Sequence, residues 1–367
     1  MIVKNEEEVI ARCLETVKDL VDEMTIVDTG STDATKEIVS RYTSLIFNFP
    51  WIDDFAAARN YAFSLATMEY ILWLDADDII LAEDQEKLLK LKKAFDLSVD
   101  AVNMHYVLAY DQYGNATFSL RRNRLVRNCR RFQWIGAVHE YIEVSGVVLN
   151  TDIAISHKGD QRESDRNLRI YENRLAKGEK FGPRDMYYYA NELREHQEYS
   201  KAVEYYQQFL ALEEGWVEDK ISACSKLADC YNMLANPTEE RISILRSFNY
   251  DSPRAEFCCR LGYQDLQAGK VKQAVFWYKL ATELESPTET WGPINHAYWT
   301  WLPHLQLCVC YDRLGQYELA HKHNELARTF VPEDPRVLHN KKYLENILGL
   351  TPLLPGIGKP LQIAYSA

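Results

Sequence analysis

The sequence lacks any long hydrophobic run. Its longest apolar stretches fall far short of the roughly 20 residues that a membrane-spanning helix needs. Met1 is followed within a few residues by the charged stretch KNEEE, where a signal peptide would have its apolar core. We therefore expect a cytoplasmic protein with no membrane span.

Paired cysteines and excess positive charge are also missing. Eight cysteines are present, but none are spaced as CxxC, so buried reduced thiols are a better expectation than disulfides or a zinc site. The chain has 54 acidic and 42 basic residues, a net charge of -12, which argues against nucleic acid as the main partner. Local basic patches remain compatible with this charge.

The 367 residues, 47% of them hydrophobic, are enough for two domains, and the two halves of the chain differ in their hydrophobic patterns. Short β-rich apolar runs over 25–27, 45–49, 70–74 and 101–108 alternate with helical patterns over 6–22, 35–42 and 56–66. Beyond about residue 180 the strand signals nearly vanish and helical periodicity takes over. The sequence therefore predicts an α/β domain over 1–180, an all-α domain over 181–350 and a tail over 351–367.

The all-α half contains internal repeats. Segments 260–287 and 306–332 align with each other, and 187–212 fits the same pattern. A weaker copy over 221–248 is interrupted by Asn236-Pro237. The copies resemble tetratricopeptide repeats, with a turn glycine at Gly269 and Gly315 and small residues where paired helices cross. We expect a short solenoid with a concave groove; an unrelated helical bundle is the alternative.

An acidic cluster follows the apolar run YILWL. Asp75, Asp77 and Asp78 occupy three of four consecutive positions, and like charges this close are unfavourable without a cation or open water. Asp28 ends an earlier strand pattern. Strands running in one direction would gather these carboxylates at the carboxyl edge of a parallel sheet, where open α/β folds bind ligands. A solvated turn is the alternative.

Four motifs follow one another in the first half: VKNEEEVIARCLETV, IVDTGSTDATKEIV, FPWIDDFAAARNYAFSLA and the segment ending in LDADD. Together they resemble the family 2 inverting glycosyltransferases of the nucleotide-diphospho-sugar transferase (GT-A) fold, over about residues 1–158. The resemblance implies a nucleotide-diphospho-sugar donor, with uridine or thymidine as the base. It also implies Mn²⁺ or Mg²⁺, which carboxylates hold and which offsets charge on the leaving diphosphate.

The resemblance also assigns roles to single residues. It implies nucleotide contacts for Asn5, Glu6, Asp28 and Arg59, a ribose contact for Asp75, and metal ligation by Asp77 and His157. Arg124 belongs to a group of six arginines within 121–131 that are candidates to bind the diphosphate or the acceptor. The alternatives are an N-capping turn for Asp28, a surface position for Arg59 and a structural role for His157.

The catalytic base is expected at Glu140. The family carries a Glu-Asp pair at this place, with the second acid as the base, and here the sequence reads His139-Glu140. Glu140 would deprotonate the acceptor as it attacks the anomeric carbon from the face opposite the nucleotide. A structural glutamate paired with an arginine is the alternative, and Asp111 and Asp152 are other candidate bases.

A family 2 domain followed by tetratricopeptide-like repeats resembles bacterial peptide glycosyltransferases that modify bacteriocin precursors (glycocins) on cysteine or serine. The resemblance implies transfer of a hexose from a UDP-linked donor to a peptide held by the repeats. Aromatic residues offered for the groove are Tyr187–Tyr189, Tyr205, Tyr206 and the tryptophans within 291–301. The alternatives are a glycan acceptor, a non-catalytic repeat adaptor, and repeats that serve self-association in a homodimer.

Overall fold

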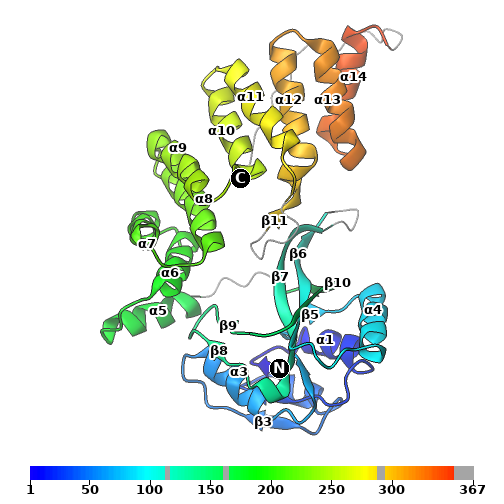
Figure 1. Cartoon of the computed structure of the whole chain (residues 1–367), viewed down its shortest axis with the longest axis vertical. Helices are drawn as coiled ribbons and strands as arrows, with labels where there is room; N and C mark the ends of the chain where they lie inside the picture. The colour runs from blue at the N-terminus through cyan, green and yellow to red at the C-terminus, as the bar shows by residue number, and fades with distance from the viewer. Residues whose placement is uncertain (112–115, 160–164, 287–293, 351–367) are drawn as a thin grey trace. The chain divides into compact units, whose positions relative to one another are not determined.

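The computed structural model describes residues 1–111, 116–159, 165–286 and 294–350 (Figure 1). These residues form two compact units, and the chain passes from the first to the second after Gly215. The expected tail over 351–367 lies outside the described residues. Within the described ranges, no helix is both long and apolar enough to cross a membrane.

The chain begins with a three-stranded parallel sheet in the order β1-β2-β3. Its elements are β1 (Ile2–Val3), α1 (Ile10–Val17), β2 (Ile26–Asp28), α2 (Thr35–Val39) and β3 (Ile46–Asn48). The buried side chains of α1 recur every three or four residues, so one face of the helix packs on the sheet. Because the strands are parallel, β1 and β2 end at the same edge, and the loops that follow them meet there.

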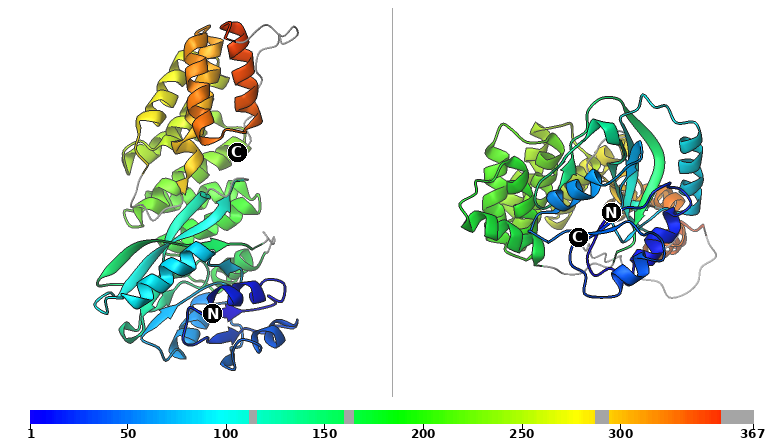
Figure 2. Two further views of the ribbon diagram at one scale, coloured as in Figure 1. Left: turned by 90° about the vertical axis from the view of Figure 1, so that its right-hand side faces the viewer. Right: turned by 90° about the horizontal axis from the view of Figure 1, so that it is seen from below.

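A second, mixed sheet follows, in the order β7-β6-β10-β5, with β4 beside β7. Its strands are β4 (Tyr70–Leu72), β5 (Asp78–Ile79), β6 (Ala101–Tyr110), β7 (Ala116–Arg127) and β10 (Val148–His157). β6 and β7 are antiparallel, whereas β6 and β10 are parallel. The long strands lie side by side in both Figures 1 and 2.

One detail of the predicted sheet is wrong. The sequence predicted that the strand before the acidic cluster joins the others in a single parallel sheet, but β4 pairs with β7 in antiparallel orientation. β4 is three residues long, and the twelve-residue β7 supplies its hydrogen-bonding edge. The two sheets are still linked, because Ala76, just after β4, packs in one core cluster with Val3 and Ile10.

Two α-helices, a 3-10 helix and a short two-stranded ribbon complete the α/β part. They are α3 (Phe55–Ser64), α4 (Ala82–Lys93), η1 (Asn128–Arg130), β8 (Trp134–Ile135) and β9 (Tyr141–Ile142). The Asp54 side chain caps α3 by accepting a hydrogen bond from the Ala57 backbone N–H. α3 packs near β8, where Trp134 and Trp73 form an edge-to-face pair with ring centroids 4.7 Å apart.

The rest of the described chain is almost entirely helical, from green to red in Figure 2. The first unit contains α5 (Arg166–Ala176), α6 (Pro183–Glu195) and α7 (Tyr199–Ala211). The second contains α8 (Val217–Met233), α9 (Pro237–Arg246), η2 (Ser247–Asn249), α10 (Ala255–Gln267), α11 (Val271–Glu283), η3 (His296–Trp299), α12 (Trp301–Arg313), α13 (Tyr317–Phe330) and α14 (Pro335–Ile347). The expected fold class, an α/β domain followed by tetratricopeptide-like helices, is confirmed.

The helix pairs share one turn geometry. Between the helices of each pair stands a residue with positive φ: Gln197, Ala235, Gly269 and Gly315. Only the two glycines could be identified from the sequence, since glutamine and alanine rarely adopt this conformation. Asn236-Pro237 does not interrupt the pattern, because Asn236 caps α9 and Pro237 is its first residue.

Small residues allow the paired helices to approach. Ala274 and Ala320 are completely buried, and a Cβ added to Gly262 would lie 2.9 Å from the Tyr278 ring. Among the aromatic residues expected to line a groove, Tyr187, Tyr189 and Tyr206 are instead buried in the packing. Trp291 lies outside the described residues. All eight cysteines are free thiols, as expected, and seven of them are buried.

Candidate active site

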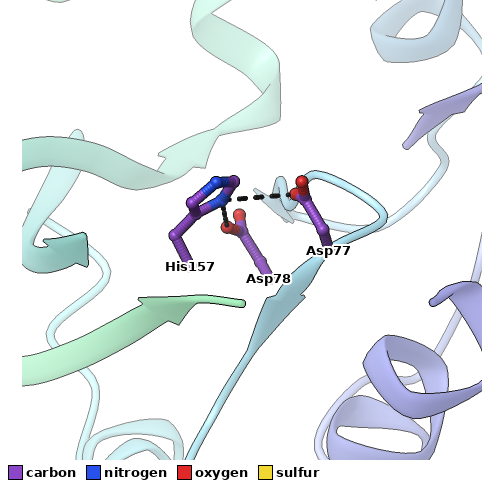
Figure 3. Close-up of side chains that lie close together, drawn as sticks. All are labelled: Asp77, Asp78 and His157. Atoms are coloured by element: carbon purple, nitrogen blue, oxygen red, sulfur yellow. Dashed lines mark ion pairs between the residues drawn. The ribbon is translucent and has the colours of Figure 1, made fainter. Parts of the chain in front are cut away.

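Two carboxylates of the acidic cluster, Asp77 and Asp78, lie close to the imidazole of His157 (Figure 3). The Nδ1 atom of His157 lies 3.5 Å from Asp77 Oδ1 and 3.8 Å from Asp78 Oδ1. One possible ligand atom from each of the three residues lies within 4.8 Å of the others. The structure therefore brings together the two residues expected to bind metal, Asp77 and His157, and adds Asp78 to them.

Strand register places this group. β5 and β10 are antiparallel, and His157 stands directly opposite Asp78. The backbone N–H of Lys158 donates to the Asp77 carbonyl oxygen at 3.0 Å, which holds the two chain segments together. A Cβ at Gly159 would lie 2.2 Å from Asp77 Oδ2, so only glycine leaves room for this carboxylate.

These three residues suit a divalent cation. The nearby carboxylates of Asp77 and Asp78 raise the pKa of His157 to about 10, although burial lowers it, so they already favour a positive charge here. Among the described residues, the buried Asp78 Oδ1 has no hydrogen-bond partner. Two carboxylates with one imidazole form a donor set that suits Mn²⁺ better than Mg²⁺.

Arg124 lies beneath this group, in the core. Arg124 and Asp78 have no exposed side-chain surface, and Arg124 Nη1 donates to Asp78 Oδ2 at 2.9 Å. The guanidinium carbon lies 4.0 Å from the Trp73 ring centroid and 4.3 Å from that of Tyr106. The sequence suggested a substrate contact for Arg124, but this arginine is enclosed by protein and holds Asp78 in place.

Arg59 joins Asp75 to the expected base. Its Nη2 donates to Asp75 Oδ1 at 2.7 Å and its Nε donates to Glu140 Oε1 at 2.5 Å. Its guanidinium carbon lies 5.1 Å and 4.8 Å from the ring centroids of Trp73 and Trp134. Arg59 is therefore neither a surface residue nor directed only to the nucleotide, since it binds two carboxylates from different segments.

Charge interactions within this bridge favour the ionised forms of Asp75 and Arg59. Burial opposes ionisation of Asp75, yet Arg59 and Arg124 hold the pKa of Asp75 well below its usual range. Burial likewise lowers the pKa of Arg59, but the carboxylates of Asp75 and Glu140 raise it above its ordinary value. The side chain of Glu140, the candidate base, is 10% exposed.

Three of the residues expected to contact the nucleotide, Asn5, Glu6 and Asp28, lie at the ends of β1 and β2. Asn5 Oδ1 accepts from the Thr32 N–H at 2.8 Å, and the Glu6 N–H donates to Thr35 Oγ1 at 2.7 Å. Asp28 is 1% exposed and accepts hydrogen bonds from the Gly30 and Ser31 backbone N–H groups. Its own turn thus accounts for these contacts, and the loops carrying Asn5, Glu6 and Asp28 form one connected network.

A further arginine, Arg122, was not singled out from the sequence. Its guanidinium carbon lies 5.7 Å from the Tyr106 ring centroid, and within the described residues it forms no ion pair and its buried Nε has no hydrogen-bond partner. Burial lowers the pKa of Arg122, and the neighbouring Arg124 lowers it further. An anion beside Arg122 would relieve both effects. The arginine cluster signalled such a residue, but it did not distinguish Arg122 from Arg124.

A second arginine that the sequence analysis missed, Arg166, lies near both the nucleotide loop and the candidate base. Burial lowers the pKa of Arg166, at the start of α5, and the carboxylates of Glu6, Glu140 and Glu192 partly offset this. The nucleotide loop and the candidate base thus lie near one cation. Asp152, another candidate base, has an 83% exposed side chain and pairs with Lys87 on the surface.

The α/β fold gathers acidic residues and a histidine at its strand ends, an arrangement that agrees with the resemblance to glycosyltransferases. The sequence profile of Glycosyl transferase family 2 matches residues 1–147. The chain therefore carries a domain of this family at its N-terminus, as its motifs predicted.

Two curated relatives show the extent of the similarity. A TPR repeat-containing protein of Synechococcus elongatus is 36% identical over 149 residues, 41% of this chain and 36% of that protein. The SPbeta prophage-derived glycosyltransferase SunS of Bacillus subtilis is 32% identical over 143 residues, 38% of this chain and 33% of that protein. The matched part thus spans about a third of each relative.

Solved structures of repeat proteins are also similar. The C-terminal part of a TPR repeat-containing protein from Cytophaga hutchinsonii aligns with a TM-score of 0.41 and 10% identity, covering 50% of this chain and 66% of that one.

Proposed function

We propose that this protein is a metal-dependent, inverting glycosyltransferase that moves a hexose from a UDP-sugar to a cysteine or serine side chain of a peptide. The observation that carries the proposal is the convergence of two groups in a family 2 domain. One is the cluster of Asp77, Asp78 and His157; the other is the bridge from Asp75 through Arg59 to Glu140.

The acidic residues and the histidine have separate roles in this proposal. Asp77, Asp78 and His157 would hold Mn²⁺ or Mg²⁺, which when bound offsets the negative charge of the diphosphate. Glu140 takes the proton from the acceptor thiol or hydroxyl. The acceptor sulfur or oxygen then attacks the anomeric carbon, the bond to the UDP oxygen breaks, and the configuration inverts.

Asn5, Glu6, Asp28 and Asp75 bind the nucleotide in this proposal, with Arg122 in place of Arg124 as the contact to the diphosphate. The partly buried guanidinium of Arg122, which has no ion-pair partner among the described residues and whose Nε has no hydrogen-bond partner there, supports this change. Arg124 acts indirectly, by fixing the Asp78 carboxylate from below. Arg59 holds the Glu140 carboxylate through its Nε and so keeps it aligned with the donor side of the site.

A panel of nucleotide sugars tests the activity. We expect the chain to release UDP from at least one UDP-sugar in the presence of Mn²⁺, and expect Asp77→Asn to abolish the Mn²⁺-dependent part of UDP binding in calorimetry. The fold should survive, because Asp77 is partly exposed at a strand end. Asp19→Asn, at an exposed turn position, is the control. Unchanged metal dependence in Asp77→Asn would show that the acidic cluster is only a turn.

The peptide acceptor is tested by shortening the chain after Gly215, at the boundary between the compact units. We expect the shortened protein, once circular dichroism shows it folded, to bind UDP and slowly hydrolyse the donor but to lose transfer to peptides. The assay is mass spectrometry of a library of cysteine- and serine-containing peptides. Peptide transfer at the full-length rate would exclude α8–α14 as the acceptor platform.

A further inference from the structure

One face of α6 contacts the segment that carries the candidate base. Arg184, Tyr188 and Glu192 are spaced four residues apart, so their side chains project from the same side of the helix. All three contact His139, the residue before Glu140. α6 lies in the first compact unit, together with the α/β domain.

The contacts to His139 are of three kinds. His139 Nε2 lies 2.6 Å from Glu192 Oε1, within hydrogen-bonding distance. The imidazole stacks on the Tyr188 ring, with centroids 4.4 Å apart and planes 18° from parallel. Arg184 Nη2 donates to the His139 carbonyl oxygen at 2.8 Å. Side chain and backbone of His139 are thus both held by one helix.

The backbone of His139 is also unusual. Its φ is +50°, in the left-handed region that few residues other than glycine adopt, although histidine, asparagine and aspartate adopt it more often than most. Such a conformation persists where surrounding contacts determine it, and it often occurs at functional sites. The turn reverses the chain just before Glu140, so the conformation of His139 sets the direction in which the Glu140 side chain leaves the backbone.

Glu192 is unusual for the middle of a packed helix. It is 4% exposed, and burying a carboxylate is costly unless it is hydrogen-bonded and near positive charge. Besides His139, Asn167 Nδ2 donates to its Oε1 at 3.2 Å. An apolar side chain would fill this position at a lower cost in desolvation free energy. We therefore explain the carboxylate by its contacts with His139 and Asn167.

We propose that α6 is part of the catalytic centre: Glu192 acts through His139, and Arg184 through the His139 carbonyl, to position Glu140. This inference rests on the proposed function, in which Glu140 is the base. Glu192 and Arg184 are positioning residues. The first repeat-like helix therefore serves the chemistry, separately from any acceptor that α8–α14 hold.

Steady-state kinetics of the full chain test this role, with the UDP-sugar that the wild-type protein turns over fastest. We expect Glu192→Gln to lower kcat about tenfold or more, with KM for the donor and the Kd for UDP with Mn²⁺ within about twofold. Glu195→Gln, on the same helix with a 63% exposed side chain, is the matched control and should behave as wild type.

A double variant shows whether the effect passes through Glu140. In a Glu140→Gln background, Glu192→Gln should lower kcat no further, because residues acting as one unit are not additive. A full additional loss, or wild-type kcat in Glu192→Gln alone, would overturn the inference. If Glu192→Gln does not fold, His139→Asn replaces it, since asparagine tolerates the left-handed conformation but lacks the imidazole contacts.

Amide hydrogen exchange separates failure of this inference from failure of the proposed function. We expect Glu192→Ala to speed exchange in residues 136–142 while β6 keeps its protection, whether or not a donor is turned over. If no sugar nucleotide reacts with the wild-type chain, the glycosyltransferase proposal fails. Unchanged exchange in 136–142 would then show that α6 does not hold this segment.

Discussion

Replacing Glu140 by glutamine is expected to lower kcat for transfer by at least about 100-fold while leaving the affinity for UDP with Mn²⁺ unchanged. A glutamine amide keeps the shape of the side chain and still accepts the hydrogen bond from Arg59 Nε. It cannot take a proton from the acceptor. Single-turnover transfer assays and UDP calorimetry measure the two quantities separately.

Glu143→Gln provides the control, because Glu143 is exposed and lies three residues further along the same segment. Near-normal transfer by Glu140→Gln would place the base elsewhere or show that an already ionised thiolate acceptor needs none. Comparing a cysteine with a serine acceptor peptide separates these outcomes, since the serine hydroxyl is not ionised at neutral pH.

The second large effect is expected in stability. Arg124→Ala should lower the free energy of unfolding by about 3–5 kcal/mol, because it leaves the Asp78 carboxylate buried without its cation. Adding Asp78→Asn should recover part of this loss, since the amide carries no charge to bury. Urea denaturation followed by fluorescence and by circular dichroism measures both variants.

Arg41→Ala is the control for this measurement. Arg41 pairs with Glu37 four residues away on the surface, where such pairs contribute about 0.5 kcal/mol or less. If Arg124→Ala were as stable as Arg41→Ala, then Arg124 would not support Asp78, and a substrate contact for Arg124 would regain its interest.

Local patterns in the sequence carried much of the fold. The apolar runs that became β2 to β4 and β6 were each visible, as were helices α1 to α3, because side-chain burial imposes short-range periodicity. The pairing of β4 with β7 was not visible. This pairing joins segments more than fifty residues apart. The apolar pattern of each strand fits a parallel sheet as well as an antiparallel one, so the sequence does not reveal the partner or its direction.

The candidate site shows the same limit. Asp77 and His157 could be paired through the resemblance to a known family, but the register that sets His157 opposite Asp78 belongs to the folded sheet. Arg122 and Arg124 stand two positions apart on β7, and irregularities in the β6–β7 pairing help to decide which is enclosed. The contact between His139 and Glu192 spans 53 residues and has no local pattern at all.

The turn residues of the helix pairs mark a further limit. Glycine at 269 and 315 signals a left-handed turn because glycine adopts it without strain. Gln197 and Ala235 adopt the same conformation without that signal, so two of the four turns are set by the packing of the helices that they connect.

The attachment of α6 to the His139 segment affects how chimeric enzymes should be assembled. A designer who exchanges helical arrays between related proteins to redirect them to new acceptors would choose the junction at residue 180, where strands give way to helices. That junction would exchange Arg184 and Glu192 along with the array and release the turn before Glu140. A junction after Gly215 keeps α6 and α7 with the glycosyltransferase domain that they contact, and it leaves α8 to α14 as the exchangeable part.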